Sequence, residues 1–163
     1  GRGGSIKAKM NSLVDPGIIA LLYEASQAGV HIQLIIRGMC SLYPGLEGIS
    51  DNISVVSIIG RFLEHSRIFW FNNGGEPEVF IGSADLMPRN LDRRVEAVVP
   101  IEEPDLRAQL EGLLERYLND NRGAWDMQTD GTFIQRHPDG EERNSQLQLM
   151  DDWKGGALIQ SNR

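Results

Sequence analysis

The sequence predicts an α/β sandwich, in which a mixed, mainly parallel sheet is flanked by helices. Two patterns predict this fold. Between Ile6 and Ile36, an alternating, an amphipathic and a fully apolar segment follow one another, which is the order of a right-handed βαβ unit. Between Arg67 and Ile81, two apolar segments flank a segment rich in turn-forming residues, which indicates a β-hairpin. A last strand and a last helix extend this arrangement.

The βαβ unit is defined by clear boundary residues. Residues Ile6–Met10 alternate between apolar and polar types, which predicts a strand. Asp15 and Pro16 then supply a helix N-cap and a proline at the first helical position. Apolar residues spaced for one helical face follow: Ile18, Leu21, Leu22 and Ala25. Gly29 ends the helix, and Val30–Ile36 is apolar enough for a strand covered on both faces.

The middle of the chain adds a strand and the hairpin. Residues 39–50 carry proline and glycines and are predicted to form a loop, and Ile53–Ile59 is a third apolar strand. Arg67–Phe71 and Glu78–Ile81 are predicted to pair as antiparallel strands. Residues 72–77, which contain two asparagines, two glycines and a proline, form the turn between them.

The C-terminal part is predicted to contain two strands and two helices. Arg93–Val99 is predicted to be a strand, and Pro104 begins a helix. The apolar residues of this helix share one face that most simply packs on the core: Leu106, Leu110, Leu113, Leu114, Tyr117 and Leu118. Residues 128–136 are predicted to be a further strand, and Ser145 to cap a short helix that ends at Trp153.

Four segments are expected along the chain. Residues 1–5 are a glycine-rich flexible leader, and residues 6–126 form one globular domain. Residues 127–153 are a short C-terminal extension with a strand, a turn and a helix. Residues 154–163 are expected to be disordered.

Composition and charge limit the classes of function. Of the 163 residues, 40% are hydrophobic and 24% are charged, as in an ordinary soluble domain. The net charge is −7, and the excess acid lies in residues 101–163. An acidic chain argues against non-specific binding of duplex nucleic acid, which needs many cations. It still allows a local site for a polyanion, because residues 1–100 are close to charge balance and the motif region keeps its arginines.

Location is predicted from cysteine content and hydropathy. Cys40 is the single cysteine, so an internal disulfide is excluded, and a reducing cytoplasm is favoured. Cys40 is expected to be a small buried apolar residue. No apolar run has the length of a transmembrane segment, and no secretory signal opens the chain.

A candidate site lies around the hairpin. His65 and Arg67 are two residues apart on a predicted strand, so their side chains share a face. Gly82 and Ser83 follow the second hairpin strand and are expected to present a hydroxyl and free backbone N–H groups at the same edge. Guanidinium, imidazole, hydroxyl and amide groups at one edge suit a phosphoryl group.

Arg37 is a second candidate, because it directly follows an apolar strand. Ligands of open α/β sheets bind beyond the carboxyl ends of the strands. From position alone, however, a surface arginine that pairs with a loop carboxylate is the default interpretation.

The order of these residues resembles a known motif. His65, Gly82 and Ser83 match the phospholipase D superfamily pattern His-x-Lys-x4-Asp followed by Gly-Ser-x-Asn, and Arg89 and Glu96 occupy its later positions. Three residues depart from the pattern: Arg67 replaces the lysine, Asn72 the aspartate and Asp85 the asparagine. These departures argue against a phospholipase or a nuclease.

Two stretches are more specific. Gly60–Arg67 and Ile81–Glu96 resemble the last domain of bacterial polyphosphate kinase, the family that synthesises long-chain polyphosphate. The resemblance extends over about Ile6–Trp125 and implies a phospholipase-D-like α/β sandwich. It also implies reversible transfer of the terminal phosphate of ATP to polyphosphate. The implied partners are ATP, ADP, polyphosphate and the upstream domains of the same enzyme.

The resemblance assigns roles to individual residues. It implies that a phosphohistidine forms in the preceding domain, and that the ligands of Mg²⁺ also lie outside this chain. His65 then corresponds to a catalytic, nucleotide-contacting group that transfers protons. Arg37 corresponds to an arginine that contacts nucleotide phosphate, which reverses the default interpretation above. Arg67, Ser83 and Arg89 would supply supporting phosphate contacts.

The family further implies a homo-oligomer of the full-length enzyme, located in the cytoplasm or associated with the membrane, with no nucleic-acid partner. Because one histidine motif is present, this chain alone is expected to be inactive. A non-catalytic module that binds phosphate or polyphosphate, or that packs against a partner, is the alternative. A phosphodiesterase assembled from two copies of the motif is a weaker one, which the missing motif residues disfavour.

Overall fold

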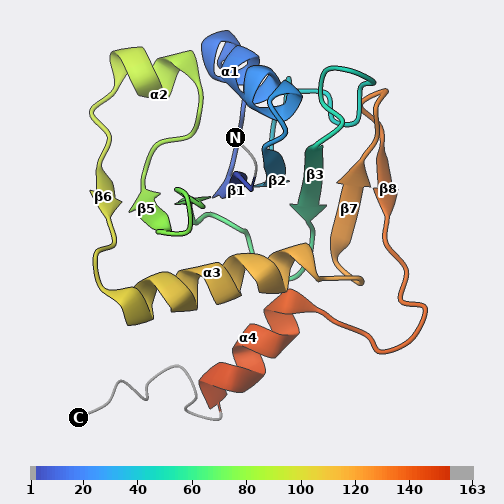
Figure 1. Ribbon diagram of the computed structural model, residues 1–163. Helices are drawn as coiled ribbons and strands as arrows, with labels where there is room; N and C mark the ends of the chain where they lie inside the picture. The colour runs from blue at the N-terminus through green and yellow to red at the C-terminus, as the bar shows by residue number, and fades with distance from the viewer. Residues whose placement is uncertain (1–2, 155–163) are drawn as a thin grey trace.

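The computed structural model describes residues 3–154. They form one mixed sheet of eight strands in the order β6-β5-β4-β1-β2-β3-β7-β8 (Figure 1). The strands are β1 (Ser5–Met10), β2 (His31–Ile36), β3 (Ile53–Ile58), β4 (Ile68–Phe71), β5 (Glu78–Gly82), β6 (Val98–Pro100), β7 (Ala124–Met127) and β8 (Phe133–Gln135). The helices are α1 (Pro16–Gln27), α2 (Pro88–Arg93), α3 (Pro104–Leu118) and α4 (Ser145–Lys154).

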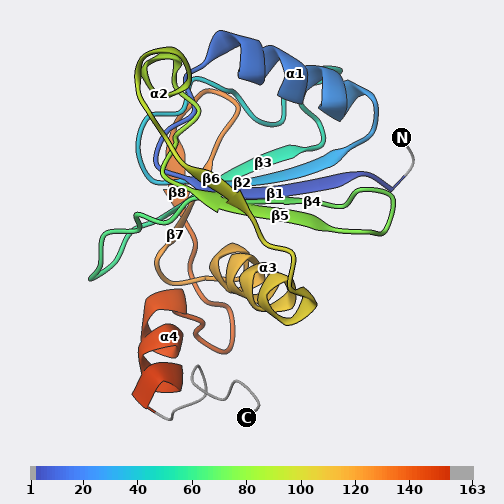
Figure 2. The same cartoon turned by 90° about the vertical axis from the view of Figure 1, so that its left-hand side faces the viewer.

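The helices lie on both sides of the sheet, as the α/β sandwich prediction requires. Figure 2 shows α1 and α2 on one face of the sheet and α3 and α4 on the opposite side. The prediction that the sheet is mainly parallel is wrong. Parallel pairing is confined to β1 with β2 and β2 with β3, and the other five strand pairs are antiparallel. Two of the antiparallel pairs, β4 with β5 and β7 with β8, are hairpins joined by short turns, and a short turn permits only antiparallel pairing.

The predicted βαβ unit is confirmed. The strand β1 begins at Ser5, one residue before the predicted start. It pairs with β2 in a parallel register that runs from Ser5 opposite His31 to Met10 opposite Ile36. The Asp15 side chain accepts a hydrogen bond from the Ile18 N–H at 2.9 Å and so caps α1. Beyond the helix, Gly29 has a φ of 84°, which glycine adopts without strain.

The hairpin is also confirmed, but the segments beside it differ from the prediction. Ile68 of β4 pairs with Ile81 of β5. His65 and Arg67 lie in a segment without regular secondary structure before β4, and not on a strand. The strand predicted at Arg93–Val99 is wrong over most of its length. Pro88 at a first helical position begins α2, which ends at Arg93, and β6 contains only Val98–Pro100.

The C-terminal part is continuous with the sheet. β7 pairs with β3, and β8 pairs with β7, so the strand predicted at residues 128–136 is shorter and follows a turn. The helix α4 is capped by Asn144, whose Oδ1 accepts from the Leu147 N–H at 3.1 Å, and not by Ser145. The Ser145 hydroxyl donates instead to buried Asp120 at 2.7 Å. The predicted disordered tail lies outside the described residues, except for Lys154.

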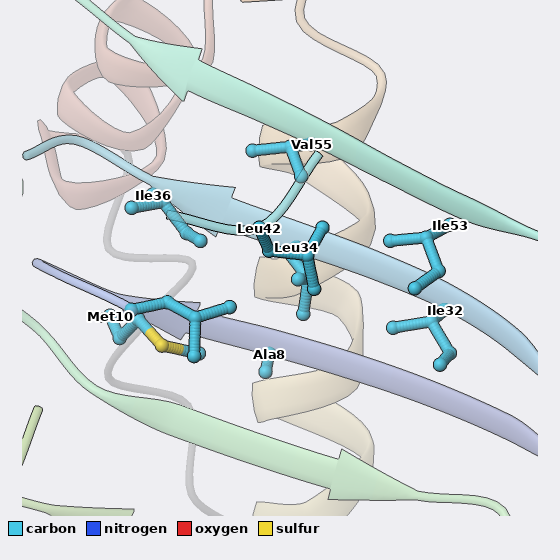
Figure 3. Packing of buried hydrophobic residues seen from close by; sticks show 9 residues of the cluster. Ala8, Met10, Ile32, Leu34, Ile36, Leu42, Ile53 and Val55 are labelled. Atoms are coloured by element: carbon cyan, nitrogen blue, oxygen red, sulfur yellow. The ribbon is translucent and has the colours of Figure 1, made fainter. Parts of the chain in front are cut away.

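Two hydrophobic clusters fix the layers. One cluster packs α1 against the sheet and contains side chains of β1, β2 and β3, several of which Figure 3 shows: Ala8, Met10, Ile32, Leu34, Ile36, Leu42, Ile53 and Val55. The other lies on the opposite face, where Leu114 and Tyr117 of α3 pack on Ile35, Val56 and Trp70. Both faces of β2 and β3 are therefore covered, which explains why their sequences are mostly apolar.

Two further expectations concern Cys40 and the membrane. Cys40 is half-buried against the first cluster, and burial raises the pKa of its thiol. This agrees with a structural cysteine. Among the described helices, none has both the length and the apolar character that a bilayer crossing requires.

Candidate functional site

A polar pocket lies beside the carboxyl end of β1 and the ends of β2 and β5. Its volume is about 490 Å³. All five residues that the sequence singled out line it: Arg37, His65, Arg67, Ser83 and Arg89. The edge of the sheet predicted from the motif is therefore a real concave surface, and it carries the expected side chains.

Arg37 is held by Asn11, the residue that directly follows β1. Its Nε donates to Asn11 Oδ1 at 2.6 Å, and the following Gly38 N–H donates to the Asn11 carbonyl at 2.7 Å. The partner of Arg37 is thus an amide and not the loop carboxylate of the default interpretation. Because an amide leaves the positive charge of the guanidinium uncompensated, Arg37 can offer that charge to an anion in the pocket.

Asp85 is the best-connected acid of the pocket. Arg67 binds it with two nitrogens, Nε to Oδ1 at 3.2 Å and Nη2 to Oδ2 at 3.0 Å. Asn11 donates to it from its backbone N–H at 2.7 Å and from its side chain at 3.1 Å. Burial would raise the pKa of Asp85, but the hydrogen bonds from Arg67 and Asn11 outweigh burial and hold the pKa below its usual value.

Arg67 also orients His65. Its Nη1 donates to the His65 carbonyl at 2.8 Å and lies 3.0 Å from the ring atom Nδ1. His65 is exposed at the pocket, whereas Arg67 is half-buried. One side of the guanidinium is therefore fixed by Asp85 and the other side faces the imidazole. Although the segment is not a strand, the two side chains meet, as the prediction from their spacing of two residues required.

Ser83 makes a different contribution from the one predicted. Its backbone N–H donates to the Ala97 carbonyl at 2.9 Å, so it is not a free donor for a ligand. The Gly82 N–H donates to the Arg67 carbonyl, so it is also engaged. The prediction of free N–H groups at this turn is wrong, because Gly82 still belongs to β5 and Ser83 bonds to the residue before β6.

The Ser83 hydroxyl belongs to a network with Glu96. Ser83 Oγ and Asn90 Nδ2 each donate to the Glu96 carboxylate at 2.5 Å, and Arg94 Nε lies 3.3 Å from it. The hydrogen bonds from Ser83 and Asn90 lower the pKa of Glu96. This network ties α2 to the end of β5 and so places Arg89, which is exposed on α2, at the mouth of the pocket.

The family model "Polyphosphate kinase C-terminal domain 2" matches residues 1–147. This chain belongs to the polyphosphate kinase family. Proteins named polyphosphate kinase from Parasynechococcus marenigrum and Pseudomonas aeruginosa are 74% and 52% identical to it. The alignments cover 96% and 93% of this chain but only 22% of each relative, so the chain spans about a fifth of their length.

Solved structures agree with this assignment. The crystal structure of polyphosphate kinase from Porphyromonas gingivalis matches with a TM-score of 0.90 and 41% identity, over 96% of this chain and 24% of that one. Nuc from Salmonella typhimurium, a phospholipase D family member, matches with a TM-score of 0.58 and 20% identity, over 76% of this chain and 82% of that one. The second match shows the fold alone, and the predicted phospholipase-D-like fold is confirmed.

The geometry explains two of the three departures of this polyphosphate kinase domain from the phospholipase D motif. Arg67 and Asp85, which replace a lysine and an asparagine, are bound to each other. A fork-shaped guanidinium matches a carboxylate with two parallel hydrogen bonds, which a lysine and an amide cannot do. The third departure, Asn72, lies past the other end of β4, where it accepts from the Gly75 N–H in the hairpin turn.

Sequence reasoning missed the roles of Asn11 and Asn90. Asn11 contacts Arg37 and Asp85, although its residue type gives no charge signal. Its position directly after β1 is the one available signal, because side chains there face the ligand edge of the sheet. Asn90 could not be placed without α2, which the sequence reading did not predict.

The donor groups of the described residues do not form a metal site. Within residues 3–154, no three histidine, cysteine or acidic side chains lie close enough to hold a metal ion. The two acids of the pocket, Asp85 and Glu96, both have their oxygens engaged by other residues. The described residues therefore do not fit a protein-held Mg²⁺ site.

Proposed function

We propose that this chain is the C-terminal catalytic part of a polyphosphate kinase, which reversibly transfers the terminal phosphate of ATP to polyphosphate. In this proposal the phosphohistidine forms on a histidine in the preceding domain, outside this chain. His65 is the catalytic residue here, and Arg37 binds the nucleotide phosphates together with His65. Arg67, Ser83 and Arg89 support that site.

The observation that carries the proposal is the distribution of charge in the pocket. Four arginines line it together with His65, in a chain whose net charge is −7: Arg37, Arg67, Arg89 and Arg94. Glu96 compensates Arg94. Asp85 compensates Arg67, but Arg37 is bound to an amide. The pocket is thus a locally cationic place on an acidic protein, which suits a polyphosphate or a nucleotide phosphate.

The geometry supports a division of labour among the residues. Phosphoryl transfer requires in-line positioning and stabilisation of negative charge more than covalent chemistry. Arg37 would bind phosphate oxygens, and Arg67, fixed by Asp85, would hold the His65 ring in place. When the histidine outside this chain attacks the γ-phosphorus, the bond to the bridging oxygen breaks and ADP leaves. His65 would donate a proton to that oxygen and take it back in the reverse reaction.

Several features of the whole enzyme remain proposals. Mg²⁺ would be bound by the ATP phosphates and by residues outside this chain, where it would neutralise phosphate charge. ATP, ADP and polyphosphate are the proposed ligands, and the upstream domains of the same polypeptide are the proposed partners. The full enzyme is proposed to be a homo-oligomer that works in the cytoplasm or at the membrane, without a nucleic-acid partner.

Replacement of His65 tests the proposal. In the longer enzyme, His65→Ala should lower transfer in both directions by roughly 10²–10⁴-fold, the range for a positioned acid–base group. His31→Ala, at an exposed position on β2 that does not line the pocket, is the matched control and should retain the rate. The chain alone, incubated with labelled ATP, should neither become labelled nor make polyphosphate.

The outcomes separate the two candidate functions. Unchanged transfer by His65→Ala, with loss of phosphate binding in an Arg37→Ala variant, would favour the alternative, a non-catalytic module that binds phosphate or packs against a partner. Acid-labile label on the isolated chain would instead show that a nucleophile lies within it.

A further inference from the structure

A buried cluster lies behind the pocket and is not part of it. Lys9 of β1 is fully buried, and its ammonium lies 3.2 Å from the Glu64 carboxylate. The ammonium also lies 5.0 Å from the centre of the Tyr117 ring of α3. Burying a charge is unfavourable unless it is paired and hydrogen-bonded. A fully buried lysine in the core therefore calls for an explanation beyond stability.

The cluster contacts the chain on both sides of His65. Glu64 and Ser66 are the immediate neighbours of His65 in the sequence, and Lys9 contacts both of them. Its ammonium forms an ion pair with Glu64 and donates to the Ser66 hydroxyl at 2.9 Å. The segment that holds His65 has no strand or helix hydrogen bonds of its own. Side-chain contacts must therefore fix its position.

A third element fixes the same segment. Gln146 of α4 donates to Glu64 Oε1 at 2.7 Å and to the Phe62 carbonyl at 2.9 Å, and its own oxygen accepts from the Phe62 N–H at 2.9 Å. One carboxylate oxygen of Glu64 thus contacts Lys9 of β1, and the other contacts Gln146 of α4. On the pocket side, Arg67 holds the His65 carbonyl.

We propose that Lys9 and Glu64 are positioning residues for His65, and that their buried ion pair holds the His65 segment at the geometry the reaction needs. This inference rests on the proposed function of His65. Lys9 and Glu64 do not line the pocket, so they act through the backbone of residues 64–66 and not by contact with a substrate. A displacement of a catalytic group by about 1 Å can lower a rate roughly 10²-fold.

Lys7 provides a matched control. It lies two residues from Lys9 on the same face of β1, is paired with Glu111 and Glu115 of α3, and lies 4.3 Å from the Trp70 ring centre. Lys7 therefore resembles Lys9 in strand, charge, ion pairing and aromatic contact, but it does not touch the segment of His65.

The test uses one single and one double variant. Lys9→Met leaves Glu64 buried without its ion-pair partner and should destabilise the chain. The double variant Lys9→Met, Glu64→Gln is neutral at both positions, keeps an oxygen for Gln146, and should regain most of the melting temperature. In the longer enzyme we expect this double variant to remain about 10- to 100-fold slower in transfer, with kcat lowered more than KM is raised. Lys7→Met should retain kcat.

A spectroscopic measurement separates this inference from the proposed function. In the isotope-labelled 163-residue chain, backbone order parameters of residues 64–67 should fall from the rigid range, about 0.85, in the double variant, and stay there in Lys7→Met. The ring signals of His65 are measured in the same samples. They can be assigned readily, because the chain has three histidines in all. If order falls but the transfer rate is normal, while His65→Ala is inactive, the positioning role is refuted and the proposed function stands.

The remaining outcomes are equally decisive. A double variant that regains both its melting temperature and its transfer rate would show that the pair acts on stability alone, and would overturn the inference. If His65→Ala itself transfers phosphate normally, the proposed function fails, and with it any catalytic role for the pair. The order parameters then still report whether Lys9 and Glu64 hold the segment.

Discussion

The ion pair between Arg67 and Asp85 gives the sharpest quantitative prediction. Both side chains are close to 10% exposed, at 12% for Arg67 and 10% for Asp85. In Asp85→Asn, an NH₂ group would replace one carboxylate oxygen and face the donors of Arg67 and Asn11. Breaking a buried pair costs about 3–5 kcal/mol. Because this pair borders an open pocket, we expect the lower end, about 3 kcal/mol of the free energy of unfolding.

The pair also predicts a coupling energy. Arg67→Lys together with Asp85→Asn restores the phospholipase D motif residues at both positions. Since the two side chains are in contact, the double variant should be less destabilised than the sum of the single variants, by about 1–3 kcal/mol. Urea denaturation of the 163-residue chain measures all four proteins.

The control is Asp151→Asn, which removes an exposed ion pair with Lys154 and should change stability by less than about 0.5 kcal/mol. The pH dependence supplies a second check. The pKa of Asp85 is lowered in the folded state, so its carboxylate stabilises the fold above the unfolded value near pH 4. That contribution is lost as the pH falls through the folded pKa. A wild-type advantage over Asp85→Asn that grows below about pH 4, or strictly additive single effects, would refute the reasoning.

Two other predictions concern the α3 side of the sheet. Leu114→Ala, at a fully buried position, should cost about 2–5 kcal/mol in thermal unfolding, whereas Leu106→Ala, 48% exposed on the same helix, should cost less than about 0.5 kcal/mol; equal costs would refute the packing. Hydrogen bonds from Ser145 and the Gly123 N–H outweigh burial and lower the pKa of Asp120. Asp120→Asn should therefore increase hydrogen exchange in α4 at pH 7. The effect of this substitution should become smaller as the pH falls below about 4. Unchanged exchange at pH 7 would show that Asp120 does not anchor α4.

Local sequence signals predicted the elements that have strong boundary residues. Asp15 and Pro16 mark the start of α1, and Pro104 the start of α3, because capping and proline geometry are local properties. The parallel character of the sheet was overestimated. Strand pairing depends on contacts between distant segments, such as β3 with β7, which no local pattern encodes.

The site was predicted in its charged residues and not in their supports. Spacing and motif order identified His65, Arg67 and Ser83, and the structure brings all three to one pocket. Asn11 and Glu64 remained hidden, because their importance comes from contacts with Asp85 and Lys9, which lie far away in sequence. The free N–H groups expected at Ser83 are absent, because whether a backbone amide is engaged depends on the neighbouring strand.

The central claim is that the pocket of Arg37, His65 and Arg67 is an anion site for phosphate chains. NMR titration of the 163-residue chain with inorganic triphosphate tests it directly. Each sheltered charge-assisted contact contributes about 1.5–3 kcal/mol, and less in water, so a dissociation constant near the millimolar range is expected. Signals of Arg37, His65 and Arg67 should shift, and binding should weaken as salt is added. Shifts confined to Arg107 and Arg116 of α3, with none at the pocket, would contradict the account.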